Sequence, residues 1–515
     1  NAIRNFKKYF KKKKESALIM RKQTKLVAVL SAAALLAIGA SMTSFAAQGW
    51  QEENGTWVYY DKDGYQVTDT WEKSGNNWFY LNGDGEMATE EIIDDGNNYY
   101  YVDANGAMVT NQWVAVENES AGEENEPDSY WYYFQANGKA YKSGDSISWK
   151  TINEKKYAFD NEGKMLYGWV DKETGDRLPG NGYEAWSEAE YFCGDENDGA
   201  RASGWAKIDV VDDKDEDQSY WFYFNTANGT KTVDATAKTI NGKKYAFNED
   251  GVMQSKWYVV NATKAEASKS NVAGYSYYNQ PDEGWRQKGW VKAIPGADID
   301  KDGNWNEDTN WYYVQNNGDV CQSELKTIDS KKYAFNEKGA MMSGLWAIKL
   351  DGTKILSSSY KLDNSDKIDA VKGTDFKIYY FGSGDDGAAK VGNQNVEVDG
   401  ETYSYTFVKT GMDKYTGEET VSSDMTNSKT KAIYVKGQKI KADKDLRYEA
   451  TDLKGNKSSR GDAYDKYLVN TSGSLMKNKA SGVKDSDDFV YKTDKYGMVI
   501  EVLDSNGDVV SKPSK

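Results

Sequence analysis

The aromatic side chains are the residues of this chain whose types and spacing could do chemistry. Trp57, Trp78 and Tyr99 stand 21 residues apart, and a glycine follows each of them after seven residues. The face of an aromatic ring attracts cations, and the same apolar surface stacks against sugar rings. The chain holds 17 Trp and 38 Tyr, so binding by ring faces is the chemistry that the composition favours.

Other kinds of chemistry are excluded or disfavoured. The chain has no His, which removes Ser–His and Cys–His nucleophiles and every His-ligated metal site. Hydrolysis by paired carboxylates stays open because it needs only Asp and Glu. Cys193 and Cys321 do not occupy equivalent positions of the repeats, and we expect two buried, idle thiols rather than a disulfide. We expect no cofactor and no enzyme.

The element that must position the rings is a β-hairpin. Each aromatic segment alternates over about four residues and then meets a turn such as DKDG, GDG or ANG, which is the pattern of strand, tight turn and strand. One hairpin cannot bury a core alone, so the hairpins must stack. The sequence therefore predicts an all-β fold, a β-solenoid of stacked hairpins with a degenerate β-rich C-terminal segment.

Two kinds of hairpin alternate along the middle of the chain. Some read WYYF or similar, whereas three read KYAF and begin at Lys156, Lys244 and Lys332, at intervals of 88 residues. Alternation places the second and fourth residues on one face, which is aromatic in both kinds and is expected to be the core. The other face changes from Trp and Tyr to Lys and Ala. We expect that face to bind a ligand in the WYYF hairpins, and the KYAF hairpins to be structural spacers. In the alternative, both faces are packing surfaces.

Composition divides the chain into five parts. Residues 1–19 do not begin with Met and are expected to be translated upstream sequence. Residues 20–46 have the basic, apolar and small-residue regions of a signal peptide. Residues 47–149 carry the 21-residue repeats, and residues 150–345 carry the array with the 88-residue period. No Trp follows Trp346, so residues 346–515 are expected to be a β-rich tail without the tryptophan surface.

Charge limits the partners. Removing residues 1–46 takes away ten basic residues and one acidic residue, so the net charge falls from −16 to −25. A surface this acidic disfavours nucleic acid and anionic membranes, and we expect no membrane insertion after signal cleavage. The chain ends without a hydrophobic tail, which favours non-covalent attachment to a surface.

Acidic loops separate some of the aromatic segments and are expected to form hairpin tips. In one of them, Asp298, Asp300 and Asp302 follow the spacing that begins a calcium loop. Position twelve of that loop is Thr309 instead of Glu, and no flanking helices are evident. We therefore expect a solvated loop rather than a metal site.

The phrases GWQEENGTWVYYDKDGYQVTDTW and WEKSGNNWFYLNGDGEMATEE resemble the choline-binding repeats by which Gram-positive surface proteins bind the cell wall. KTINGKKYAFNEDGVMQSKW is similar to the related repeats of clostridial toxins and streptococcal glucan-binding proteins. The resemblance covers most of residues 48–345. It implies a solenoid of hairpins with ligand sites between successive hairpins.

In choline-binding members, two Trp of one hairpin and a Tyr of the next enclose the quaternary ammonium group. Carried over by this resemblance, the first site consists of Trp50, Trp57 and Tyr80, and the second of Trp71, Trp78 and Tyr101. Other aromatic positions that the resemblance implicates are Tyr59, Trp113, Trp131, Tyr133, Trp205, Trp221, Tyr223, Trp290, Trp311 and Tyr313.

These observations predict a secreted protein of a Gram-positive cell wall or surface. Its expected partner is cell-wall teichoic acid or polysaccharide, bound at many weak aromatic sites, with choline or a sugar as the recognised group. One alternative is an adhesin or structural spacer that displays its acidic loops to a protein. Another is a cell-wall hydrolase whose catalytic residues lie in the tail.

Overall fold

A computed structural model describes residues 48–144, 146–267, 271–296, 299, 309–408 and 429–512. Among the described residues, strands make up 41% and helices 4%, which confirms the all-β prediction. The chain forms two compact units, residues 1–254 and residues 255–515. Within the described residues, no helix is long and apolar enough to cross a membrane. The predicted signal peptide lies outside the described residues.

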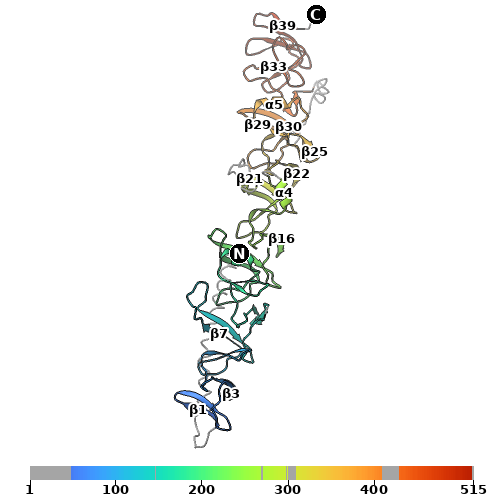
Figure 1. The fold of residues 1–515 in the computed structure, drawn as a ribbon. Helices are drawn as coiled ribbons and strands as arrows, with labels where there is room; N and C mark the ends of the chain where they lie inside the picture. The colour runs from blue at the N-terminus through green and yellow to red at the C-terminus, as the bar shows by residue number, and fades with distance from the viewer. Residues whose placement is uncertain are drawn as a thin grey trace. The chain divides into compact units, whose positions relative to one another are not determined.

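Unit 1 is a succession of antiparallel hairpins (Figure 1). Its two-stranded sheets are β1 (Gly49–Glu53) with β2 (Thr56–Tyr60), β3 (Thr70–Ser74) with β4 (Asn77–Leu81), β5 (Glu91–Asp94) with β6 (Tyr99–Val102), β7 (Gln112–Glu117) with β8 (Ser129–Phe134), β9 (Lys150–Ile152) with β10 (Lys155–Tyr157), β14 (Gly204–Val211) with β15 (Asp217–Phe224), and β16 (Ala235–Ile240) with β17 (Lys243–Phe247). A three-stranded sheet of β12 (Arg177–Leu178), β11 (Trp169–Val170) and β13 (Tyr191–Phe192) lies among them, with α3 (Tyr183–Glu188).

Unit 2 begins with hairpins and continues as larger antiparallel sheets. The hairpins are β18 (Lys256–Val259) with β19 (Tyr275–Tyr278) and β20 (Gly289–Ala293) with β21 (Asn310–Val314). The sheets, in strand order, are β23 (Lys331–Phe335), β22 (Glu324–Ile328), β26 (Lys354–Ile355), β25 (Leu350–Asp351); then β27 (Tyr360–Lys361), β24 (Leu345–Ile348), β28 (Lys377–Tyr380); then β29 (Gly392–Val398), β30 (Glu401–Phe407), β32 (Gln438–Lys439), β31 (Tyr434–Val435).

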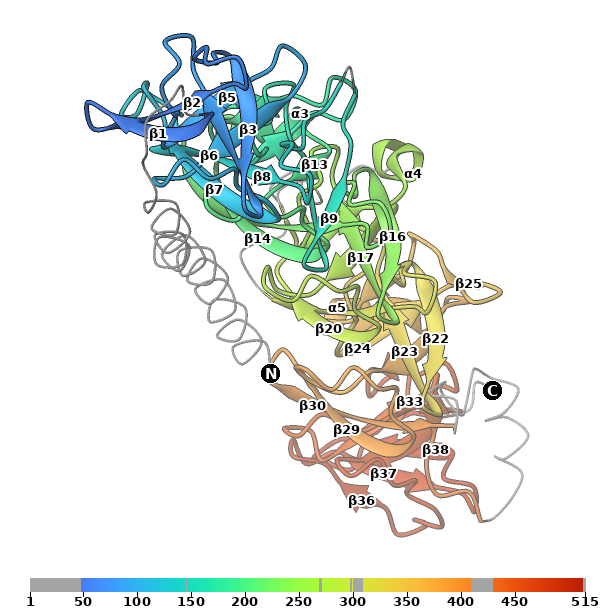
Figure 2. The same cartoon turned by 90° about the horizontal axis from the view of Figure 1, so that it is seen from below.

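The last two sheets of unit 2 are β34 (Lys457–Ser458), β33 (Tyr448–Thr451), β35 (Tyr467–Asn470) and then β36 (Val483–Lys484), β37 (Val490–Thr493), β38 (Val499–Leu503), β39 (Val509–Ser511). Figure 2 shows β29 and β30 as a long antiparallel pair. The short helices α4 (Ala262–Ala267) and α5 (Ser365–Val371) complete the unit.

The turn after each aromatic strand is held by a side chain. The Oδ1 of Asn82 accepts hydrogen bonds from the backbone N–H groups of Asp84 and Glu86, at 3.0 and 2.9 Å. Short polar side chains stabilise turns in this way because they replace a backbone acceptor. In the tail, Asp494 accepts from the N–H groups two and four residues further on, at 2.8 and 2.9 Å. The tail therefore uses the same turn as the repeats.

One backbone hydrogen bond joins each of several hairpins to the preceding one. The N–H of Met87, two residues after a turn glycine, donates to the carbonyl of Trp57 in the preceding hairpin at 2.8 Å. Met108 donates to Trp78 in the same way, also at 2.8 Å. The methionine side chain then lies against the turn glycine of the following repeat, where a Cβ at Gly106 would come within 2.7 Å of the Met87 sulfur. The glycine is therefore needed both for its backbone conformation and for this close approach.

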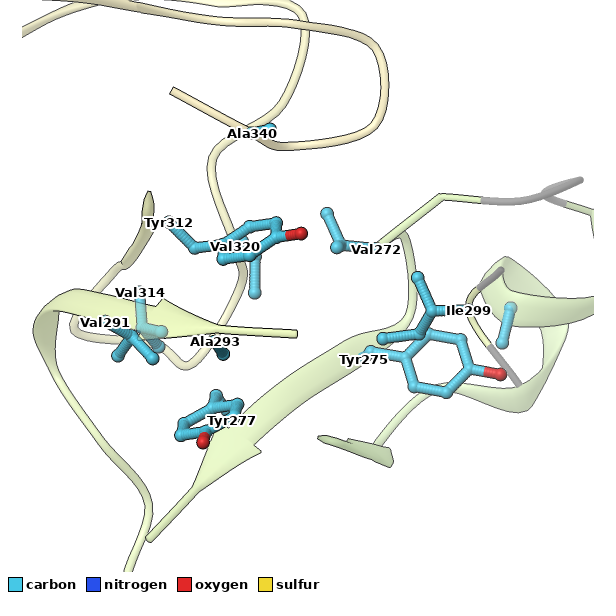
Figure 3. Close-up of a cluster of buried hydrophobic side chains, with 11 residues drawn as sticks. Val272, Tyr275, Tyr277, Val291, Ala293, Ile299, Tyr312, Val314, Val320 and Ala340 are labelled. Carbon is cyan, nitrogen blue, oxygen red and sulfur yellow. The ribbon is translucent and has the colours of Figure 1, made fainter. Parts of the chain in front are cut away.

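The core lies on the face that alternation predicts. At the second position of the aromatic segments, Phe79 is 2%, Phe222 0% and Tyr312 0% exposed. Figure 3 shows the cluster around Tyr312 in unit 2, where Val291 and Val314 of the hairpin β20–β21 lie close to Tyr277 of the hairpin before it. The inward face of one hairpin is thus covered by its predecessor.

The KYAF hairpins differ from expectation on their other face. Ala158, Ala246 and Ala334 are all fully buried, although this face was expected to lie outside the core. Ala158 packs with Leu166 and Val170 from the segment that follows it. A methyl group is small enough to let another layer approach, so both faces of these hairpins are packing surfaces, and only the lysine end of the face reaches solvent at Lys156.

The two cysteines are buried free thiols, as expected. Burial raises the pKa of Cys193 to about 12, and burial is also the main reason that the pKa of Cys321 rises to about 12. Thiols held in the neutral form are poor nucleophiles, which agrees with a packing role.

Gly199→Ala is predicted to destabilise the protein more than Gly242→Ala. Both glycines have positive φ, 59° and 78°, so each substitution costs about 1–2 kcal/mol for the backbone alone. A Cβ at Gly199 would also lie 2.2 Å from the sulfur of Met165, whose side chain is buried, whereas a Cβ at Gly242 meets nothing within 4 Å. Overpacking adds about 1–3 kcal/mol. Equal losses in urea-unfolding free energy would contradict this account of the glycine.

The free energy of unfolding is predicted to fall above pH 10. Burial raises the pKa of Tyr278 and that of Tyr491 to about 12, whereas an unfolded tyrosine ionises near pH 10. Because the folded pKa is the higher one, this stability is present below about pH 10 and is lost as the pH rises toward 12. Melting temperatures across that range should drop less for Tyr278→Phe than for the parent. The exposed Tyr65, 73% accessible, provides a control, since Tyr65→Phe should leave the drop unchanged.

Candidate ligand-binding aromatic surface

The first strand of most hairpins carries a tryptophan that packs between two hairpins. Trp113 lies 5.2 Å from Tyr133, its cross-strand partner, and 4.9 Å from Tyr157 of the following hairpin. Trp290 repeats this arrangement in unit 2, at 5.2 Å from its own Tyr313 and 4.7 Å from Tyr333 of the following hairpin. We call these side chains the stacking tryptophans: Trp50, Trp71, Trp113, Trp205, Trp257 and Trp290.

The stacking tryptophans contact the inward face of the next hairpin. Trp50 meets Phe79 at 5.4 Å, and Trp205 meets Tyr245 and Phe247 at 4.7 and 5.7 Å. Edge-to-face and tilted ring pairs at these distances are favourable beyond the area that they bury. The residues that the sequence offers as cage members on the first strand therefore connect successive hairpins, and Trp113 is only 6% exposed.

A second set of tryptophans lies beside this packing, and two of its members contact a stacking tryptophan edge to face, Trp221 with Trp205 and Trp311 with Trp290, each at 6.3 Å. It consists of the first residue of the aromatic segment on the second strand, and we call its accessible members the outward tryptophans: Trp57, Trp78, Trp221 and Trp311. Trp78 is 41% exposed, and the other three are half-buried. Trp131 has the same position in its hairpin but is 6% exposed, so its ring offers no open face.

The predicted trios are divided between hairpins. Trp50 packs on Tyr59 at 5.3 Å, whereas Tyr80 packs on Trp71 at 5.2 Å. Within the described part of the chain, no ring contact joins Trp57 to Tyr80. In the second trio, Tyr101 lies 6.0 Å from Phe134 of the following hairpin. The structure thus brings each stacking tryptophan to the tyrosine of its own hairpin, and in the hairpins of Trp205 and Trp290 the outward tryptophan lies 6.3 Å away as well.

Cations lie over three of the outward tryptophans. The ammonium groups of Lys73, Lys207 and Lys292 are 5.8, 5.7 and 5.6 Å from the ring centroids of Trp78, Trp221 and Trp311. Each lysine is the direct cross-strand partner of its tryptophan. These lysines were not predicted from the sequence, although each stands two residues after a stacking tryptophan, and that spacing places it opposite the outward ring.

Two cavities lie outside the predicted residues. One, of about 470 Å³ in unit 2, is lined by Met342, Trp346, Ile355 and Leu356, with polar groups that include Lys338 and Ser359. The other, of about 330 Å³ in unit 1, contains Tyr167 and Arg177, whose guanidinium carbon is 3.9 Å from the tyrosine ring centroid. Sequence reasoning missed both because the lining residues come together only after distant turns meet.

The first acidic loop is not a free tip. The backbone carbonyl of Asn125 accepts hydrogen bonds from Arg177 at 2.9 Å and from the hydroxyl of Tyr167 at 3.4 Å. Burial raises the pKa of Tyr167 to about 12, so this hydroxyl remains a donor at neutral pH. The loop with Asp298, Asp300 and Asp302 lies outside the described residues. Among the residues that are described, no cluster of acidic or thiol groups is suited to a metal ion.

Comparison with known proteins identifies the repeats. Residues 68–113 match a family described as the choline-binding repeat, and residues 126–140 match one described as a putative cell wall binding repeat. Both segments are therefore repeats of the cell-wall-binding, choline-binding type, as the sequence phrases indicated. Glucosyltransferase-S of Streptococcus mutans is 26% identical over 221 residues, which are 43% of this chain and 11% of that enzyme. The chain thus matches about a tenth of the length of this relative.

Two of the solved structures that match this chain come from Streptococcus pneumoniae. Choline binding protein F is 18% identical, with 72% of this chain and 99% of that chain covered and a TM-score of 0.34. The modular autolysin LytC is 19% identical, with 59% and 55% covered and a TM-score of 0.31.

Trp113→Ala is predicted to destabilise the protein far more than Trp57→Ala. Removing a buried aromatic side chain costs about 3–5 kcal/mol, and Trp113 contacts both its own hairpin and the next. Trp57 is half-buried at the surface, so its loss should cost about 1 kcal/mol. Denaturant unfolding followed by circular dichroism measures both. A larger loss for Trp57→Ala would reverse the two assigned roles.

Proposed function

We propose that this chain is a secreted surface protein that binds a repetitive cell-wall polymer non-covalently, through aromatic rings presented by a β-solenoid of hairpins. The observation that carries the proposal is the separation of roles between the two sets of tryptophans. The stacking tryptophans pack against the next hairpin, with Trp113 only 6% exposed and the others half-buried, whereas Trp78 keeps 41% of its surface accessible. Partly accessible indoles at a repeated position, on repeats of the cell-wall-binding type, are the feature that a polymer ligand would use.

The β-solenoid is supported by the contacts between hairpins. The hydrogen bond from a methionine N–H to a tryptophan carbonyl recurs between Met87 and Trp57, Met108 and Trp78, and, in unit 2, Met341 and Trp311, at 2.8 Å each time. Because these repeats form the same hydrogen bond with the preceding hairpin, each is attached to the array in an equivalent way. Repeats of this kind contact only their neighbours and bury a continuous core by stacking.

Weak single sites suit a polymer partner. One aromatic contact with a cation gives about 0.5–2 kcal/mol, and a few of them together correspond to roughly millimolar affinity. Several such sites on one chain increase the affinity for a polymer with repeated epitopes by about 10²–10⁴. A wall teichoic acid or polysaccharide would provide those epitopes, whereas a free small molecule would not.

We propose that the tail, residues 346–515, extends or caps the array and performs no reaction. Its turns are held as in the repeats, by Asp452, Asn470 and Asp494. Leu475 donates its N–H to the carbonyl of Lys431 at 2.9 Å, which resembles the link between repeats. Because the tail uses the same turns and the same type of backbone link as the repeats, we assign it a structural role in the array.

Binding to purified Gram-positive cell walls tests the proposal. We expect the protein to sediment with walls and to be released by choline or by wall oligosaccharides, whichever carries the recognised group. Trp57→Ala and Trp78→Ala should each reduce the bound fraction at least threefold, because they remove ring faces without removing core. Lys156→Ala, in a KYAF hairpin, is the matched control and should bind like the parent. Protein that stays in solution with every wall preparation would refute the proposal.

A further inference from the structure

We infer that the residue opposite each outward tryptophan sets the charge of the ligand group that its hairpin accepts. A lysine in this position excludes cations and leaves the ring to uncharged or anionic sugar units, whereas a carboxylate admits a cation. The inference rests on the proposed function and assigns a ligand class to each of its sites. It assigns a cationic group to Trp57 and sugar units to Trp78, Trp221 and Trp311.

The pairing follows from strand register. Lys73 of β3 stands directly opposite Trp78 of β4, and directly opposed residues of an antiparallel pair lie on the same face. The ammonium group is 5.8 Å from the ring centroid, and both side chains are exposed. The same register holds in the hairpins of Trp221 and Trp311, although these are longer or lie in the other unit. The placement of a lysine opposite the outward tryptophan thus follows from the strand register and recurs in three hairpins.

A ring that already holds an ammonium group is a poor site for a second cation. The attraction comes from the negative ring face, which a nearby cation partly neutralises. Two positive charges at a separation of several ångström also repel each other. An incoming quaternary ammonium group must therefore displace the lysine or share the ring with it. The charge repulsion does not arise with a sugar ring, which stacks through its C–H groups and can accept hydrogen bonds from the ammonium.

The first hairpin has the opposite charge in this position. Glu52 stands directly opposite Trp57, and its carboxylate is exposed. Among the residues that the structure describes, no lysine or arginine is placed over the Trp57 ring. Trp50 and Tyr59 share this face and lie 5.3 Å apart. A carboxylate beside several aromatic rings favours a cation without a bulky hydration shell, such as the trimethylammonium group.

Lys292 is expected to exclude cations less strongly than Lys73. Its ammonium lies 5.6 Å from the Trp311 centroid and is also paired with Asp385 at 2.8 Å. The pair carries less net charge, so its exclusion of cations should be weaker than at Trp78. The strongest exclusion is expected where the lysine is exposed and the ring most accessible, which is the hairpin of Lys73 and Trp78.

The test uses tetramethylammonium chloride as the probe and the full chain labelled with 5-fluorotryptophan. Fluorine NMR reports on each indole, and single Trp→Phe variants assign the signals. In the parent protein, tetramethylammonium should shift the Trp57 signal and leave the Trp78 signal unchanged at the same concentration. Sodium chloride at equal ionic strength corrects for screening.

Substitutions then move the preference from one hairpin to the other. Lys73→Glu should make the Trp78 signal respond with an apparent affinity at least threefold higher than in the parent, and Lys73→Ala should give a smaller gain. Glu52→Lys should weaken the response of Trp57 at least threefold. Lys62→Glu and Asp63→Lys make the same charge changes in the exposed turn that follows the first hairpin and should change neither response. Circular dichroism verifies that each variant is folded.

The outcomes separate this inference from the proposed function. If Lys73→Glu and Lys73→Ala leave the Trp78 response unchanged while the protein binds walls, the inference is wrong and the proposed function stands. If the tetramethylammonium responses follow the opposite residue but the protein binds no wall, the inference holds and the proposed function fails. A parent protein whose Trp78 responds as strongly as Trp57 would also overturn the inference.

Discussion

The rest of the structure depends on the packing of one indole between two hairpins. A two-stranded hairpin has too little apolar surface to be stable alone, and here each stacking tryptophan supplies what is missing. Trp205 lies 5.1 Å from Tyr223 of its own hairpin and 4.7 Å from Tyr245 of the next. The same ring thus closes one hairpin and begins the core of another. Because a stacking tryptophan is covered by the next hairpin, the hairpins are stable together in the array and not as single units.

Two local devices make this stacking repeatable. The Asn or Asp that begins most of the turns fixes the turn geometry through backbone N–H groups, as Asn82 and Asp103 do. The glycine in that turn then admits the methionine of the preceding repeat, and the methionine N–H binds a tryptophan carbonyl further back. Side-chain packing and backbone bonding therefore connect the same neighbours, so a hairpin added to the array is held in one register.

Division of the tryptophans into two sets connects this architecture to binding. A ring that packs against the next hairpin has less surface left for a ligand. In the hairpins with an outward tryptophan, the packing ring lies on the first strand and the outward ring lies on the second. The ring on the first strand packs against the next hairpin, whereas the first ring on the second strand stays partly accessible in the hairpins of Trp57, Trp78, Trp221 and Trp311. The residue two places after the stacking tryptophan, Lys73 in one hairpin and Glu52 in another, stands beside the outward ring and adjusts its charge.

The sequence by itself determined the repeat period, the hairpins, the all-β class and the inward face at Phe79, Phe222 and Tyr312, because turn residues and strand alternation are local properties. It also indicated the cell-wall-binding type of the repeats. Only the tertiary structure decided which rings remain accessible. Trp131 and Trp57 both begin an aromatic segment, yet the first is 6% exposed, in a cluster with Tyr157 and Phe159 of another hairpin. Ala158 likewise is buried by Leu166 and Val170. Alternation states which residues share a face, but whether that face is covered depends on segments that reach it through the folded chain.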